Sequence, residues 1–163
     1  MCRESFGLES VKIGRVKFQD ALGENKNEEP RTQNKLFRSH IMPNLKNPAI
    51  IYGFPSSITP TAKTDPLDET SALDFRLIAD GKSIIHGYTL ETDLESFREK
   101  TKINGRDLED SSFNKDLEET LKLGHLPCSG FGMGIERLIQ HLSGKEDIRS
   151  VYLFGGVKKR GSR

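Results

Sequence analysis

The sequence predicts an α+β fold in which an antiparallel sheet is flanked by helices. Three observations support this prediction: a strong hairpin signal near the middle of the chain, capped helical segments after it, and a glycine-rich extended segment that leads into another helix. With 163 residues, the chain has room for one compact domain. No apolar run approaches the roughly 18–20 residues that a membrane span requires, so we expect no membrane partner.

The hairpin is centred on Asp80-Gly81, because both residues tolerate the positive φ angles of a tight turn. It predicts strands over residues 73–79 and 82–89. In the first strand apolar and polar residues alternate, so one face is expected to be buried and the other to face water. The buried residues would be Leu73, Phe75 and Leu77, and the wet ones Asp74 and Arg76.

Three helices are predicted after the hairpin. Asp93 can cap the first, which carries Phe97 on its apolar side, and Ser111 or Ser112 can cap the second. A glycine ends each of the last two helices. The third helix follows the glycine-rich segment, and its inner face would hold Ile135, Leu138, Ile139 and Leu142.

The remaining segments carry weaker patterns. An alternation that reaches Phe18 supports at most a poor strand, and residues 23–33 are so polar that they predict a flexible loop. We expect a helix over 34–42 and apolar strands over 48–54 and 148–154. The chain is therefore divided into a poorly defined N-terminal segment (1–33), a main domain (34–155) and a basic tail (156–163).

The charge balance and the cysteines exclude several classes of protein. Twenty-five Lys and Arg residues face 24 Asp and Glu residues, whereas a general nucleic-acid or membrane binder carries a basic excess. Cys2 and Cys128 form neither a disulfide framework nor a CxxC pair, and the histidines lack metal-ligand spacing. The first ten residues contain no apolar block, so we expect no cleaved leader and a cytoplasmic location.

The glycine-rich segment is the strongest functional signal. Gly130, Gly132 and Gly134 alternate along it, which places three bare backbone positions on one face of a strand. Glycine in a strand loses entropy and packs nothing, and a flat surface for a purine ring would compensate for that cost. Arg137 follows in the first turn of the helix, where its guanidinium can fork onto a phosphate. These residues fit a nucleotide; the alternative is a glycine-rich strand packed under a helix.

Two other glycine motifs do not match. A dinucleotide fingerprint GxGxxG that starts at Gly130 requires a glycine where Ile135 stands. A phosphate-loop motif that ends in Gly81-Lys82-Ser83 requires a glycine where Arg76 stands.

Residues 130–137 resemble motif 3 of the class II aminoacyl-tRNA synthetases, GxGxGxxR leading into a helix. The resemblance extends over roughly residues 36–154, and the lysyl type fits best, followed by the asparaginyl and aspartyl types. Residues 148–154 (IRSVYLF) resemble the family's "IR-x-V-x-x-F" strand. Residues 52–55 (YGFP) and 60–63 (PTAK) resemble the lysyl-type stretch "YP…SPLAK", and residues 75–89 resemble "FELFVNGKE…NGYTEL".

The resemblance implies an antiparallel sheet that binds ATP in a bent form together with magnesium. It implies that Arg137 contacts the terminal phosphates and that the glycines at 130, 132 and 134 support the adenine. The implied reaction joins an amino acid, lysine by the best fit, to AMP and then passes it to tRNA. Catalysis would depend on positioning and charge stabilisation, with no catalytic side chain acting as a nucleophile.

The sequence departs from the family's pattern in two ways. Motif 1, which builds the dimer interface of these usually homodimeric enzymes, and motif 2, which supplies an arginine for the α-phosphate, have no counterpart. We therefore expect the chain to be the C-terminal part of a catalytic domain, inactive or nearly so by itself.

The second departure concerns the amino-acid pocket. Lysyl-type enzymes carry glutamates where Ser83 and Leu90 stand, for the metal and the substrate ammonium, and an asparagine where His86 stands. Glu91 is one residue from the lost glutamate, and a shift of one residue in a strand points a side chain to the opposite face. The implied pocket is lined by His86 and Tyr88, with Glu91 if a bulge or register change turns it inward, and no metal ligand is predicted.

Two alternatives stay open. In the first, the chain is a non-catalytic paralogue that binds a partner or a nucleotide. The loss of acidic residues at the positions of Ser83 and Leu90 favours this alternative. In the second, it is an asparaginyl- or aspartyl-type synthetase, or a related amino-acid ligase with another acceptor.

Overall fold

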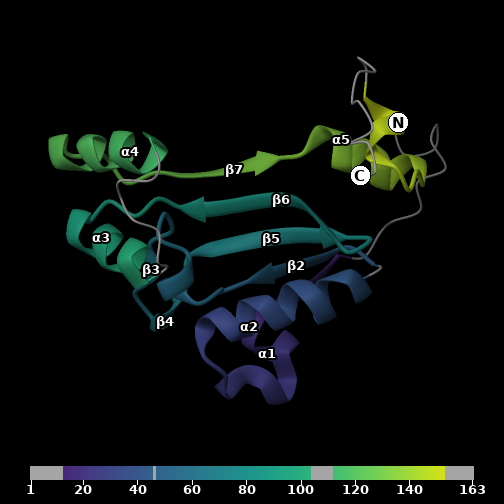
Figure 1. Cartoon of the computed structure of the whole chain (residues 1–163), viewed down its shortest axis with the longest axis horizontal. Helices are drawn as coiled ribbons and strands as arrows, with labels where there is room; N and C mark the ends of the chain where they lie inside the picture. The colour runs from purple at the N-terminus through teal and green to yellow at the C-terminus, as the bar shows by residue number, and fades with distance from the viewer. Residues whose placement is uncertain (1–12, 46, 104–111, 153–163) are drawn as a thin grey trace, which may run out of the picture.

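A five-stranded sheet forms the centre of the computed structural model, which describes residues 13–45, 47–103 and 112–152 (Figure 1). β1 runs parallel to β2, and the other neighbours are antiparallel. The predicted α+β class is confirmed, but the sheet is mixed, because the chain between β1 and β2 is long enough for a parallel crossover. In sheet order the strands are β1 (Gly14–Lys17), β2 (Ala49–Tyr52), β5 (Asp74–Ala79), β6 (Lys82–Thr89) and β7 (Ser129–Met133).

The helices lie around this sheet. α1 and α2 lie on the β2 side, whereas α4 and α5 lie at opposite ends of β7 (Figure 1). No helix in the described ranges combines the length and apolar character needed to cross a membrane. The helices are α1 (Phe18–Leu22), α2 (Pro30–Leu36), α3 (Leu94–Ile103), α4 (Ser112–Leu123) and α5 (Ile135–Ser143). Short elements are a π turn (Phe37–Ile41), 3-10 turns (Gly23–Asn27, Met42–Asn44, Ser56–Ile58, Ile148–Val151) and a separate ribbon of β3 (Thr64–Asp65) and β4 (Asp68–Ala72).

The hydrophobic core lies between α1, the π turn and one face of β2 and β5. Three phenyl rings meet there: the centroid of Phe54 is 4.6 Å from that of Phe18 and 5.4 Å from that of Phe37. Phe18 starts α1 and does not extend the strand before it, so the poor strand predicted up to this residue ends at Lys17. The core also contains Leu22, Ala49, Ile51 and Ile78, so part of the expected N-terminal segment packs with the main domain.

The flexible loop predicted over residues 23–33 is wrong. A 3-10 turn and α2 occupy this segment, and α2 begins at Pro30, whose fixed φ suits the first turn of a helix. The Gln33 side chain is buried, and its amide nitrogen donates to the carbonyls of Lys26 (2.7 Å) and Glu28 (2.9 Å). A buried polar side chain thus forms hydrogen bonds with the backbone carbonyls of this segment. These bonds order the segment although it has little apolar surface to bury. The helix predicted over 34–42 starts earlier and passes into the π turn after Leu36.

The predicted hairpin is confirmed, but the buried face of its first strand is not the predicted one. Asp80 and Gly81 have φ angles of 50° and 70°, and β5 pairs with β6 on either side of them. Asp74 and Ile78 are buried, at 5% and 0% exposure, whereas Phe75 and Leu77 are only half-buried. A register shift after Leu77 and the α-helical cover on the Ile78 side explain why simple alternation fails.

The C-terminal elements agree with the sequence in part. The Asp93 side chain accepts a hydrogen bond from Ser96 N (2.7 Å), as predicted for the cap of α3. The apolar face of α5 is not an inner face, since Ile135, Ile139 and Leu142 are exposed. The strand predicted over 148–154 is a 3-10 turn as far as residue 151, because the Asp147 carboxylate caps it by accepting from Arg149 N. Residues 153 and 154, the basic tail, Ser111 and Cys2 lie outside the described residues.

Candidate functional site

One face of the sheet is buried at β2 and exposed to solvent at β6 and β7. Cross-strand pairing places Ile51, Arg76, His86 and Gly132 in one row, and paired residues project to the same face. At Ile51 this face is fully buried in the core, whereas His86 and Gly132 are exposed. The open half of the face, on β6 and β7, is therefore where a ligand can reach the predicted site residues.

The glycines of β7 leave an open surface. A Cβ atom built on Gly130 or Gly132 would meet no heavy atom within 4 Å, and neither residue has a positive φ. Packing within the described part of the chain therefore does not require glycine at these two positions. Gly134 differs, because a Cβ there would lie 3.4 Å from Cδ of Arg137. The bare stretch at Gly130 and Gly132 is free for a planar group from outside the chain.

Arg137 lies at one end of this surface. It is in the first turn of α5, directly after the glycine segment, and its Nη1 donates to the Ser83 carbonyl at 2.7 Å. This hydrogen bond joins α5 to the β5–β6 hairpin and fixes the guanidinium beside Ser83. The remaining N–H groups of the guanidinium are available to an anion, since the fork has five donors.

A basic cleft extends from Arg137 towards the hydrophobic core. It has a volume of about 640 Å³ and lies between the π turn, the hairpin and α5. Gln140 of α5 and two acidic residues of the loop after it, Glu146 and Asp147, also line the cleft. Four cationic side chains line the cleft: Arg38, Arg76, Lys82 and Arg137. Of these, only Arg137 was predicted from the sequence.

Arg38 and Arg76 were missed for different reasons. The sequence pattern places Arg76 on a wet strand face, yet its guanidinium lies 3.9 Å from the ring centroid of Phe54, at the edge of the core. The signal in the sequence is that Asp74 and Arg76, two opposite charges two residues apart, lie on the same face of the strand. Such a pair can turn towards the core. Arg38 reaches the cleft from the π turn, and no local pattern indicates that contact.

His86 and Tyr88 lie farther along β6 on the same face. Their ring centroids are 5.5 Å apart, and His86 Nε2 is 3.7 Å from the buried Asp74 carboxylate. Tyr88 lines a hollow of about 310 Å³ together with Leu90, Gly130 and Gly132. The structure thus brings the predicted amino-acid residues His86 and Tyr88 next to the glycine surface, with the basic cleft at its other end.

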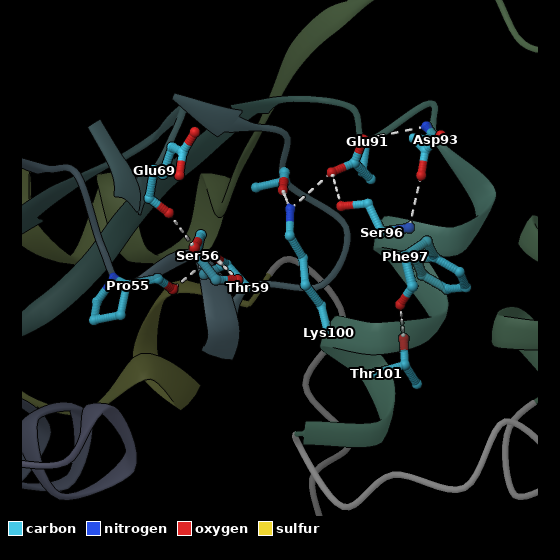
Figure 2. A network of polar contacts seen from close by, with 11 residues as sticks. Pro55, Ser56, Thr59, Glu69, Glu91, Asp93, Ser96, Phe97, Lys100 and Thr101 are labelled. Atoms are coloured by element: carbon cyan, nitrogen blue, oxygen red, sulfur yellow. Dashed lines mark hydrogen bonds and ion pairs between the residues drawn. The ribbon is translucent and has the colours of Figure 1, made fainter. Parts of the chain in front are cut away.

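Glu91 does not join them. Figure 2 shows its carboxylate directed towards α3, where it accepts hydrogen bonds from Lys100 Nζ (2.7 Å) and Ser96 Oγ (2.7 Å). Both Glu91 and Lys100 are buried, and Lys100 also donates to the Ala62 carbonyl (2.9 Å). Burial opposes ionisation of Glu91, but the hydrogen bonds outweigh it and lower the pKa of the carboxyl. The bulge or register change that would direct Glu91 to the open face is not observed in the described part of the chain. Its carboxylate instead joins two parts of the fold.

The comparisons with known proteins agree with this arrangement. The family model of class II tRNA synthetases (D, K and N) matches residues 3–158. The chain is 34% identical over 127 residues to the lysine–tRNA ligase of Enterococcus faecalis, covering 74% of this chain and 25% of that protein. It is 31% identical over 132 residues to the lysine–tRNA ligase of Bacillus subtilis, covering 78% of this chain and 26% of that protein.

A solved structure gives the same fold. A putative aspartyl-tRNA synthetase from Leishmania major superposes with a TM-score of 0.63 at 20% identity, over 86% of this chain and 29% of that one. The mixed sheet, its glycine-rich strand and the helix that follows define a partial class II synthetase catalytic fold. The chain belongs to the class II tRNA synthetase family of the D, K and N types. It spans about a quarter of the length of the curated relatives named above.

Proposed function

We propose that this chain forms the nucleotide-binding part of a lysine–tRNA ligase-type catalytic domain, in which a purine lies on Gly130 and Gly132 and the phosphates meet Arg137. The open glycine surface carries this proposal, because no packing within the described residues accounts for the two glycines. The relatives named lysine–tRNA ligase support ATP-dependent activation of lysine and transfer to tRNA as the activity of the complete domain. Such a role in protein synthesis supports a cytoplasmic location.

The amino-acid end of the site would be the hollow beside His86 and Tyr88. Leu90 lines this hollow, so an apolar side chain stands where the lysyl-type pattern has the glutamate for the substrate ammonium. Glu91 is left out of the proposal, because its carboxylate is held by Lys100 and Ser96. An unpaired buried ammonium would cost several kcal/mol, so we expect weak binding of free lysine by this chain alone.

Magnesium fits the residues poorly. Mg²⁺ in nucleotide sites is held by one or two carboxylates and the substrate phosphates. Ser83, at the position of the family's acidic ligand, directs its hydroxyl to the Ile85 carbonyl (3.3 Å). Within the described part of the chain, no three His, Cys, Asp or Glu side chains form a metal-binding group.

The test is equilibrium binding of ATP to the purified chain by titration calorimetry. We expect Arg137→Ala to weaken ATP binding by about tenfold to a hundredfold, because a charge-assisted hydrogen bond to a phosphate contributes about 1.5–3 kcal/mol. Arg15→Ala, which removes an exposed arginine stacked over Tyr52 and outside the basic cleft, is the control and should bind ATP like the wild type. Absence of ATP binding by the wild-type chain, or equal affinity of the Arg137 variant, would contradict the proposal.

A second candidate function is nucleotide binding without catalysis. The serine at position 83 and the leucine at position 90 favour it, since both replace acids that the lysyl-type pattern uses. Lysine-dependent exchange between ATP and pyrophosphate separates the two functions. A chain that binds ATP but gives no exchange above background, even when the remainder of a lysyl-type catalytic domain is supplied in trans, is a non-catalytic binder.

A further inference from the structure

The basic cleft carries an excess of positive charge that the described residues do not neutralise. Arg38, Arg76, Lys82 and Arg137 come from four separate elements and converge on one volume of about 640 Å³. No ion pair in the described ranges joins any of these four side chains to a carboxylate. Like charges held together are destabilising unless an anion lies among them.

The two acids of the cleft do not change this balance. Glu146 and Asp147 lie at its α5 side. The Asp147 carboxylate is already occupied by Arg149, whose Nε donates to both of its oxygens at 2.8 and 2.9 Å. Among the described residues that line the cleft, one carboxylate without an ion-pair partner, that of Glu146, therefore faces four cations.

Arg76 is the least satisfied of the four. Its guanidinium stacks on the Phe54 ring at 3.9 Å, and its Nε is buried with no hydrogen-bond partner among the described residues. Burial lowers the pKa of Arg76; the nearby Asp74 carboxylate opposes this effect and the charge of Arg38 adds to it. Arginine nevertheless stays protonated in proteins, so the fold holds a partly desolvated guanidinium with an unused donor.

We propose that the inner end of this cleft, between Arg38 and Arg76, is a phosphate subsite that holds the end of a polyphosphate chain by guanidinium groups in place of a divalent cation. A planar guanidinium matches two phosphate oxygens at once, and a stacked arginine is pre-organised for that contact. The inference rests on the proposed function for the phosphates at Arg137 and extends it beyond that residue. In this inference Arg38 and Arg76 neutralise the negative charge of the phosphates. A metal ion does so in the lysyl-type pattern, but Ser83 stands where that pattern has the acidic ligand for the metal.

The experiment titrates the wild-type chain with inorganic triphosphate, in EDTA and again with MgCl₂. We expect binding in EDTA, and no tighter binding when magnesium is added. Arg76→Met keeps an apolar stem on Phe54 and should weaken triphosphate binding by about tenfold to a hundredfold. Arg38→Gln alters an exposed side chain and should weaken it in the same direction, which keeps the test valid if the Arg76 variant does not fold.

Matched controls lie outside the cleft. Arg15→Met removes another strand arginine that stacks on an aromatic ring, 5.7 Å from the Tyr52 centroid, and Lys35→Gln removes an exposed cation from α2. Both should bind triphosphate like the wild type. Triphosphate binding that requires magnesium, or that neither cleft variant weakens, overturns the phosphate subsite.

Titrations with ATP and adenosine separate this inference from the proposed function. If ATP binds equally well to the wild type and to both cleft variants, the proposed function stands and the subsite is wrong. If triphosphate binds as expected but adenosine does not bind and ATP binds no tighter than triphosphate, the subsite stands and the purine surface is wrong. If none of the three compounds binds, both are wrong.

Discussion

Gly87 and Gly130 occupy neighbouring strands, but their surroundings are opposite. A Cβ on Gly87 would lie 2.5 Å from the Phe75 ring and 2.9 Å from Cβ of Phe131, whereas a Cβ on Gly130 would meet nothing within 4 Å. Gly87 is therefore required by the packing of two aromatic residues across the sheet. No contact within residues 13–45, 47–103 and 112–152 requires a glycine at position 130, so substitutions at the two positions test what the glycine surface does.

Alanine substitutions should move stability in opposite directions at these two residues. Gly87→Ala should lower the free energy of unfolding by about 1–3 kcal/mol, the usual cost of overpacking. Gly130→Ala should leave it unchanged or raise it by about 0.5–1 kcal/mol, because alanine loses less backbone entropy than glycine. Urea unfolding followed by circular dichroism measures both. A large loss of stability in the Gly130 variant would show that the glycine serves packing, and would remove the argument for a ligand surface.

Among the elements, the buried pair of Glu91 and Lys100 joins the segment that follows β6 to α3 (Figure 2). Glu91→Gln should lower the free energy of unfolding by about 3–5 kcal/mol, since it removes the negative charge that the buried Lys100 ammonium contacts. The double variant Glu91→Leu, Lys100→Met should lose less than the single one, because a hydrophobic pair replaces two desolvated charges.

The matched control for this pair is Glu95→Gln, on the same helix. Glu95 pairs with Arg98 but its side chain is 79% exposed, so the change should cost no more than about 1 kcal/mol. A double variant that is less stable than Glu91→Gln would mean that the ion pair adds net stability and not only specificity of packing.

The elements that could be predicted from sequence are those whose cause is local. The Asp80-Gly81 turn and the Asp93 cap depend on residues within one turn of the chain, and both are confirmed. The parallel pairing of β1 with β2 and the inward direction of Asp74 and Arg76 depend on contacts distant in sequence. The site follows the same division: the glycine segment and Arg137 form one local motif, whereas Arg38 and Arg76 reach the cleft only through the tertiary fold.

At the scale of the whole molecule, several carboxylates share one direction of pKa shift. Hydrogen bonds from Lys17, Arg98 and Arg149 lower the pKa of Asp68, Glu118 and Asp147 respectively, that of Asp147 to about 2. The pKa of Glu91 is also lowered, against the effect of its burial. Each of these groups binds protons more weakly in the folded chain than in the unfolded chain, so their contributions to stability have the same sign.

This shared direction predicts the acid limb of the stability profile. The unfolded chain takes up protons first as the pH falls, so the free energy of unfolding should decrease from about pH 5 downward and be fully retained above it. Urea unfolding at a series of pH values measures the slope. Asp68→Asn removes one of the shifted carboxylates and should make the slope shallower. Stability that stays constant between about pH 5 and pH 3 would show that these ion pairs are equally formed in the unfolded chain, since linkage depends only on the difference between the two states.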